Sequence, residues 1–436
     1  FSVYYLLILS IIFYAYSNIE YLPLLIISIV INFIFSNLIK NNSKNISLSK
    51  IILIFSIVFN LVLLAYFKYS SFILNDILGI FIFDDSYIFD GQIPLGISIY
   101  SFTQIGFLVD CYKKKTEKTD LGSYALFVSL FPHVLAGPII HHKDIISQIR
   151  SNSLNLLSSL NIRNGILLFV IGLSKKLLIA DNLAPIADSL FSNPENVDII
   201  STWIGTLAYT FQLYFDFSGY SDMALGIALM FNIILPINFN SPYKSKSLID
   251  FWKSWHMTLS AFLKEYLYIP LGGNRKGEIN RYINIFLTMI LGGIWHGANF
   301  TFFFWGLFHG IGIIINHLFL NLKLNIPKIL SIFITFLFVH LCWVVFRAEN
   351  MNDAFIIYKN LINFVSLNLS TFTVSNLLIL FAALIAFFTP NSQEIVKSFK
   401  TKFELRNIVS IPFFSIIFFI SIISINSYSP FLYFAF

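Results

Sequence analysis

The histidine with the clearest chemical potential is His296, in the string ILGGIWHGANF (290–300). It lies inside a stretch without a formal charge, 282–322, and glycines flank it on both sides (Gly293 and Gly297). Glycine lets another backbone or an extended ligand come close. Apolar surroundings favour the neutral imidazole, which suits a general base near pH 7. His296 is therefore the predicted general base. The alternative is a buried histidine that hydrogen-bonds a neighbouring helix.

Two carboxylates, Asp216 and Asp222, lie in the string QLYFDFSGYSD (212–222) between two apolar runs. Ionisable groups inside apolar segments are costly and are functional candidates for that reason. The pattern predicts a helix broken at Gly219, whose carboxylates find donors, water or a substrate. The alternative is structural, with the aspartates capping the freed helix ends.

The segment 250–266 predicts an amphipathic helix in the lipid headgroup zone. His256 borders its two faces, as a second catalytic candidate or as an interfacial histidine. The chain then turns into the basic loop LGGNRKG, where Arg275 and Lys276 could bind phosphates, or act only as topology determinants or lipid contacts. The apolar face holds Phe251, Trp255, Leu259, Phe262 and Tyr266, and the opposite face holds Lys253, Ser260 and Lys264.

The elements that must position these residues are membrane helices. Of the 436 residues, 57% are hydrophobic and 11% charged, against roughly 25% charged in ordinary soluble proteins. This excludes a soluble enzyme, a disordered chain and a nucleic-acid binder, and two cysteines cannot build a disulfide framework. We expect a single all-helical membrane domain, 1–436, with about 11–13 membrane segments, some broken or re-entrant. The formal charge of +6 fits Lys and Arg retained in cytoplasmic loops.

The predicted spans follow the stretches free of Asp, Glu, Lys and Arg. These are 1–19, 21–39, 51–67, 91–109, 121–142, 199–215, 223–243, 329–346, 360–393 and 407–436, with two helices in 282–322 and a weaker candidate at 164–180.

Three long motifs carry a family resemblance. YFDFSGYSDMALG (214–226), DFWKSWHMTLSAFLKEYLYIPLGGNRKG (250–277) and GGIWHGANFTFFFWGLFHG (292–310) resemble the membrane-bound O-acyltransferase (MBOAT) family. The likeness is to its bacterial branch of alginate and peptidoglycan O-acetyltransferase membrane subunits. It implies a helical bundle with a central funnel, the family histidine (His296) at its narrowest point and His256 as the second family histidine.

The final string FLYFAF (431–436) also resembles this branch, and the resemblance implies that Tyr433 relays the acyl group. A phenol ionises near about pH 10, so a relay would need a base such as His296. The alternative for Tyr433 is an aromatic anchor at the membrane interface.

The resemblance implies an acetyl-CoA-dependent O-acetyltransferase in the cytoplasmic membrane of a bacterium. It would pass acetyl groups to an extracytoplasmic SGNH-hydrolase-type partner and on to an envelope polysaccharide, peptidoglycan before an alginate-like polymer. No metal and no cofactor beyond the donor are expected, and membrane lipids are the other expected partners. The predicted catalytic residues are His296, His256 and Tyr433, and the predicted substrate-binding residues are Trp295, Asn299, Asp216, Asp222, Arg275 and Lys276.

Three rival functions remain open. A D-alanyl transfer subunit for teichoic acids would take its acyl group from a carrier protein. A transporter or channel for acetyl groups would form no covalent acyl-protein. A lipid-directed acyltransferase would acetylate lipid rather than polymer.

Overall fold

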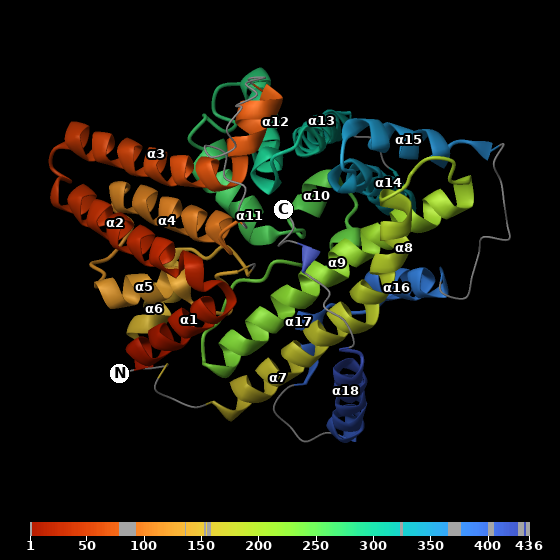
Figure 1. The fold of residues 1–436 in the computed structure, drawn as a ribbon, viewed down its shortest axis with the longest axis horizontal. Coiled ribbons are helices and arrows are strands. Elements are labelled where there is room, and N and C mark those ends of the chain that lie inside the picture. Colours follow the sequence, from red (N-terminus) through yellow and green to blue (C-terminus); the bar gives the residue numbers. More distant parts are fainter. Residues whose placement is uncertain are drawn as a thin grey trace. The chain divides into compact units, whose positions relative to one another are not determined.

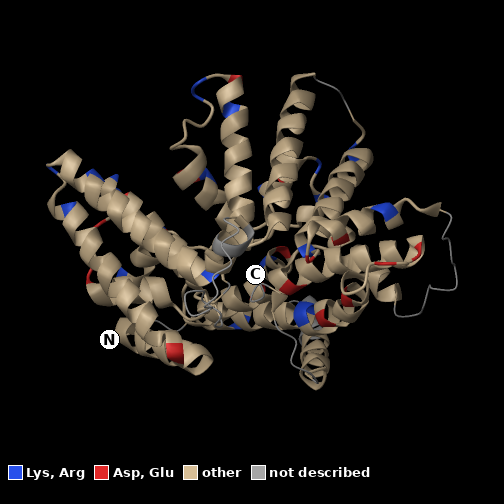
Figure 2. Ribbon diagram, turned by 45° about the horizontal axis from the view of Figure 1, so that its top comes forward, with Lys and Arg blue, Asp and Glu red and all other residues tan. Residues whose placement is uncertain are grey.

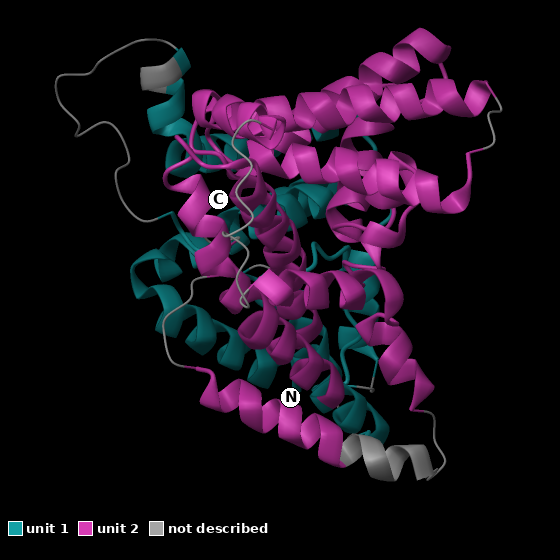
Figure 3. Cartoon of the chain, turned by 90° about the vertical axis from the view of Figure 1, so that its right-hand side faces the viewer, with its two compact units in different colours: residues 1–166, 224–236 teal, residues 167–223, 237–436 magenta. Residues whose placement is uncertain are grey.

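The computed structural model describes most of the chain and divides it into two compact units (Figure 3). Unit 1 comprises Phe1–Ile166 and Ala224–Pro236, and unit 2 comprises Leu167–Met223 and Ile237–Phe436. All regular elements among the described residues are helical, which confirms the predicted all-helical fold. The described residues are 2–77, 93–135, 137–151, 154, 158–322, 326–364, 376–399, 405–425 and 431–432.

Unit 1 is built around three neighbouring helices, α2, α3 and α4 (Figure 1). Their apolar faces enclose a few buried amides. The Asn60 amide donates to Asn32 Oδ1 at 2.7 Å, and the Gln104 amide donates to Ser28 Oγ at 2.9 Å. Buried polar groups need such partners, so these bonds fix how the three helices align. The helices of this unit are α1 (Ser2–Asn18), α2 (Leu22–Asn41), α3 (Ile46–Ser71), α4 (Ile97–Tyr112), α5 (Leu121–Ser129), α6 (His142–Arg150) and the start of α7 (Ser159–Ser174).

Unit 2 contains every predicted site residue that the structure describes. Its central pair is α12 and α13, joined by a tight connection at residues 297–299. A Cβ at Gly293 would lie 2.3 Å from the carbonyl oxygen of Phe302, so glycine is what lets the two helices approach this closely. The helices after α7 are α8 (Asp181–Phe191), α9 (Ile199–Met230), α10 (Leu248–Trp252), α11 (Met257–Leu263), α12 (Glu278–His296), α13 (Phe300–Asn321), α14 (Lys328–Arg347), α15 (Met351–Leu361), α16 (Leu377–Phe388), α17 (Ser392–Ser398) and α18 (Leu405–Ile423), with π-helical turns at Lys175–Ala180 and Lys264–Tyr268.

Four segments in the described part of the chain are long and apolar enough to cross a membrane. They are Ser2–Asn41, Ile46–Ser71, Phe300–Asn321 and Lys328–Arg347, and the bent pair α16–α17 would make a fifth. Charged residues are sparse along these helices (Figure 2). The larger number of 11–13 segments and the central funnel stay predictions.

The predicted break at Gly219 is wrong. Residues 199–230 form one continuous helix, α9, so the runs 199–215 and 223–243 are not separate spans (Figure 1). Glycine is required at position 219 for packing. A Cβ at Gly219 would lie 2.7 Å from the carbonyl oxygen of Gly172, so Gly219 permits close packing of α7 against α9 rather than a bend.

Two other predicted helices also differ from the structure. The run 121–142 is helical only to Ser129, and α6 begins at His142 after a connection that contains Pro132 and Pro138. Proline lacks an amide donor and disfavours helical geometry in the residue before it.

The predicted continuous helix over 250–266 is interrupted between α10 and α11. The apolar and charged sides are separated as predicted, since Phe251 and Leu259 are buried while Lys253 and Lys264 are exposed. The placement of this segment in the lipid headgroup zone stays a prediction. The interruption has a backbone cause. His256 adopts the left-handed conformation at φ +42° and ψ +54°, which cannot continue a right-handed helix.

Candidate active site

His296 is the last residue of α12 and is 4% exposed. Three aromatic rings contact its imidazole, with centroid distances of 5.0 Å to Trp295, 5.1 Å to Trp305 and 5.3 Å to Phe346. The space beside it, which also touches Trp343, is too small for a water molecule. The predicted burial of His296 is confirmed.

His256 lies in the turn between α10 and α11, and it is buried. The turn is held in place by backbone hydrogen bonds to the non-helical segment before α10. The amide of Met257 donates to the carbonyl of Asn238 at 3.0 Å, and the amide of Asn240 donates to the carbonyl of Ser254 at 2.9 Å. These bonds stabilise the left-handed conformation that a non-glycine residue otherwise avoids.

Trp295 lies in contact with both histidines. Its ring centroid is 6.4 Å from that of His256 and 5.0 Å from that of His296. The fold therefore brings the two predicted catalytic histidines into one aromatic cluster, with Trp295 touching both.

Asn299 has a structural use at the start of α13. Its Oδ1 accepts from the amide of Thr301 at 3.0 Å, and its Nδ2 donates to the carbonyl of Glu349 at 2.7 Å. An asparagine at this position satisfies a helix amide that would otherwise lack a partner. Its role as a donor to substrate stays a prediction.

The two aspartates of α9 each pair with a lysine from the π-helical turn that follows α7. Lys176 Nζ lies 2.7 Å from Asp216 Oδ1, and Lys175 Nζ lies 2.7 Å from Asp222 Oδ2. Ser392 of α17 donates to Asp222 at 2.5 Å. Since each carboxylate has a cationic partner, the cost of burying it is offset.

The sequence pattern did not assign a role to Lys175 and Lys176, which interrupt the apolar run 164–180. A signal was nevertheless present, because two adjacent cations and two carboxylates inside apolar segments both require partners.

Arg275 and Lys276 are exposed in the turn that precedes α12. Gly273 and Gly277, at φ +58° and +89°, shape this turn. The basic pair and His296 lie at opposite ends of α12, and 18 residues at a rise of about 1.5 Å separate Glu278 from His296 by roughly 27 Å.

A cavity of about 470 Å³ lies along the middle of α12. Its walls are mostly apolar, which is typical of ligand sites of this size. Lys253 and Lys264 are its two lysines, and both are exposed. The α12 residues that line it are Ile285, Thr288 and Met289, between the basic turn and His296.

Tyr433 lies outside the described residues. The two residues before it, Phe431 and Leu432, are described and lie against α9: the amide of Leu432 donates to Asp216 Oδ2 at 3.0 Å.

Comparison with known proteins identifies the class. Residues 11–323 match the membrane-bound O-acyltransferase family, and the chain belongs to this family. It is therefore an O-acyltransferase and a multi-pass membrane protein.

Among its relatives is a peptidoglycan O-acetyltransferase from Helicobacter pylori, 42% identical over 82% of this chain and 73% of the relative. Another is a probable alginate O-acetylase, AlgI, from Pseudomonas aeruginosa, 41% identical over 85% of this chain and 72% of the relative. A more distant relative is a teichoic acid D-alanyltransferase from Streptococcus thermophilus, 29% identical over 59% of this chain and 69% of the relative.

Proposed function

We propose that this chain moves acetyl groups from cytosolic acetyl-CoA across the cytoplasmic membrane of a bacterium for O-acetylation of an envelope polysaccharide. Peptidoglycan is the first candidate polymer and an alginate-like polymer the second, by similarity to the relatives from Helicobacter pylori and Pseudomonas aeruginosa. The observation that carries the proposal is the buried His296 at the end of α12, inside the region that matches the acyltransferase family.

In this proposal, acetyl-CoA binds between the two ends of α12. Arg275 and Lys276 would bind the phosphates of acetyl-CoA, because exposed cations in a glycine-shaped turn are free to meet an anion. The thioester would extend toward His296 along the apolar cavity whose wall is formed in part by α12.

In the chemical step, His296 would accept the proton of an attacking hydroxyl, either that of Tyr433 or one delivered by the partner. The hydroxyl oxygen forms a bond to the acetyl carbonyl carbon. The carbon–sulfur bond then breaks, and the coenzyme A thiolate leaves and takes up a proton. Burial of His296 supports this role, because a neutral imidazole can accept a proton and a protonated one cannot.

The acceptor side would involve a second protein. An SGNH-hydrolase-type partner outside the membrane would receive the acetyl group and transfer it to a sugar hydroxyl. In this scheme no metal or cofactor takes part beyond the acetyl-CoA donor.

The direct test incubates the purified chain, reconstituted in lipid, with radiolabelled acetyl-CoA or with a radiolabelled D-alanyl carrier protein. We expect covalent labelling from acetyl-CoA and none from the carrier protein. Labelling from the carrier protein alone would favour D-alanyl transfer. Acetyl flux without any covalent product would favour a transporter, and labelled lipid would favour a lipid-directed enzyme.

The polymer is identified separately, by mass spectrometry of the envelope glycans with and without the gene. Loss of acetylated muropeptides is the expected result. An unchanged peptidoglycan together with a deacetylated exopolysaccharide would identify the alginate-like polymer as the acceptor instead.

A further inference from the structure

We propose that Asp216, charge-paired with Lys176, anchors the C-terminal segment of the chain and thereby positions Tyr433. Asp216 is then a positioning residue rather than a substrate ligand. The importance of this anchor for catalysis rests on the proposed acyl transfer, but the anchor itself is a structural statement that can be tested without it.

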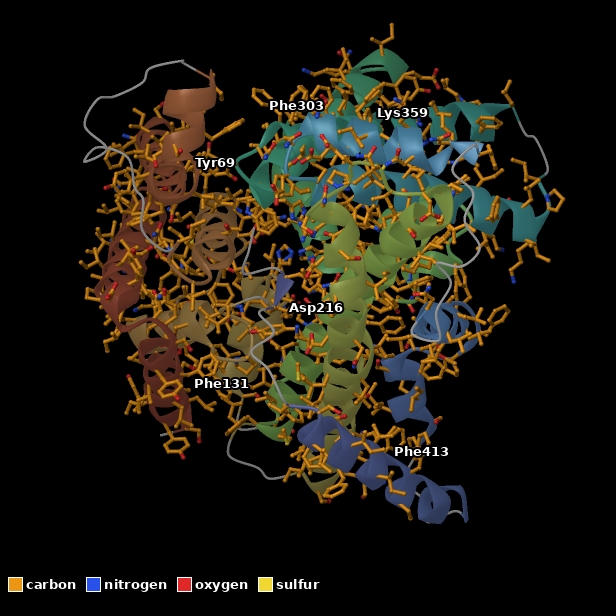
Figure 4. The ribbon with its side chains drawn as sticks, turned by 45° about the vertical axis from the view of Figure 1, so that its right-hand side comes forward. Tyr69, Phe131, Asp216, Phe303, Lys359 and Phe413 are labelled. Atoms are coloured by element: carbon orange, nitrogen blue, oxygen red, sulfur yellow. The ribbon has the colours of Figure 1, made fainter. Side chains whose placement is uncertain are left out.

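The first observation is how Asp216 uses its two carboxylate oxygens. Oδ1 lies 2.7 Å from Lys176 Nζ, and Oδ2 accepts the amide N–H of Leu432 at 3.0 Å. Asp216 is 1% exposed, and it is labelled on α9 in Figure 4. A buried carboxylate needs donors on both oxygens, and here the tail provides one of them.

The second observation is the charge count around Lys176. Its ammonium lies 2.7 Å from Asp181 as well as from Asp216, so among the described residues this one formal positive charge faces two carboxylates. An additional N–H donor on Asp216 is favourable in this setting, because a hydrogen bond to a charged group is stronger than one between neutral groups. The amide of Leu432 provides such a donor.

The third observation is the packing of Phe431, which is 6% exposed. Its ring centroid lies 4.6 Å from that of Tyr220 and 6.1 Å from that of Phe217. The ring of Phe217 in turn contacts His256, at 4.8 Å and 88°. The tail thus touches the same stretch of α9 through its backbone and through an aromatic side chain, beside the second family histidine.

Tyr433 follows Leu432 by one peptide bond, and consecutive α-carbons are about 3.8 Å apart. Whatever holds Leu432 therefore limits the region that the phenol can reach. A relay residue benefits from this restriction, because effective catalysis requires the reacting groups to be held close together.

The first experiment measures amide hydrogen exchange of the C-terminal peptide by mass spectrometry, using the full chain in lipid nanodiscs. In Asp216→Ala, we expect the Leu432 amide to exchange about tenfold faster or more, the effect of losing a hydrogen bond to a charged group. Asp222→Ala is the matched control: it also removes a lysine-paired carboxylate from α9, but Asp222 bonds Lys175 and Ser392 and not the tail. Unchanged exchange in Asp216→Ala would overturn the anchor.

The second experiment leaves the ion pair intact. Leu432→Pro removes the donor N–H, whereas Leu432→Ala keeps it. We expect Leu432→Pro to lower kcat about tenfold or more with little change in KM for acetyl-CoA, and Leu432→Ala to stay within about threefold. Equal activity of the two variants would contradict the positioning role, even if Asp216→Ala failed to fold.

The two experiments separate the possible failures. If the wild-type chain transferred no acetyl group, the proposed function would fail while hydrogen exchange still tested the anchor. If exchange were unchanged but wild-type transfer were present, only the anchor would fail.

Discussion

The imidazole of His296 and the indole of Trp305 meet edge to face, with ring centroids 5.1 Å apart and planes at 88°. This contact joins the end of α12 to α13 and orients the imidazole. An aromatic cage of this kind holds a base in one position but also limits access to it.

We predict that His296→Gln lowers acetyl transfer at least about 100-fold, the usual contribution of a general base. The amount of folded protein in the membrane should stay the same, because glutamine largely fills the space of the imidazole. Transfer from acetyl-CoA by the purified variant is the measurement. His141→Gln, at the start of α6 in unit 1, is the matched control and should keep activity. Full activity of His296→Gln would remove His296 from the mechanism.

Close packing at Gly219 gives a stability prediction. Gly219→Ala places a methyl group 2.7 Å from the Gly172 carbonyl oxygen, so we expect destabilisation by about 1–3 kcal/mol. Thermal unfolding of the purified protein checks this. Gly292→Ala is the control, because its new Cβ would meet only the flexible end of Leu263 at 3.0 Å. Similar melting temperatures for both variants would be inconsistent with the packing described.

The pair of Lys175 and Asp222 predicts strong coupling between the two residues. Lys175→Met leaves a buried carboxylate without its cation and should destabilise the fold by about 3–5 kcal/mol. Removing both charges, in Lys175→Met with Asp222→Leu, should recover much of that loss. A double-mutant cycle on unfolding free energies measures the coupling, and additive single effects would argue against it.

The backbone at His256 predicts an unusual order of tolerated residues. Asparagine adopts the left-handed conformation readily, whereas a β-branched residue is strained there. We therefore expect His256→Asn to fold as well as the wild type and His256→Val to be about 1–2 kcal/mol less stable. Thermal unfolding ranks the two, and the reverse order would contradict the observed φ of +42°.

The basic turn before α12 predicts a binding effect. Arg275→Gln together with Lys276→Gln should raise KM for acetyl-CoA severalfold while kcat changes little, because phosphates lie far from the reacting carbonyl. Added salt should weaken donor binding in the wild type more than in this variant. The control is Lys44→Gln with Lys50→Gln in unit 1. An unchanged KM in the test variant would show that other residues bind the phosphates.

Sequence patterns predicted those features that depend on local chemistry. The charge-free surroundings of His296 implied its burial, and the spacing of Phe251 and Leu259 placed both on the apolar side of 250–266. Both inferences rest on the periodicity of a helix and the cost of burying charge.

Features that depend on distant partners were not predictable in this way. A glycine such as Gly219 serves equally for a bend or for close packing, and only the position of Gly172 distinguishes the two. The break at His256 depends on backbone bonds from Asn238 and Asn240, which lie before α10. The partners of Asp216 come from the turn after α7 and from the C-terminal segment, hundreds of residues apart in the chain.

The uninterrupted length of α9 exceeds the thickness of a bilayer's hydrocarbon layer. At about 1.5 Å per residue, its 32 residues extend roughly 48 Å, well beyond a hydrocarbon layer of about 30 Å. A helix of this length could not stand upright with both ends inside the hydrocarbon layer, so a bilayer around α9 would require it to tilt or to extend into water.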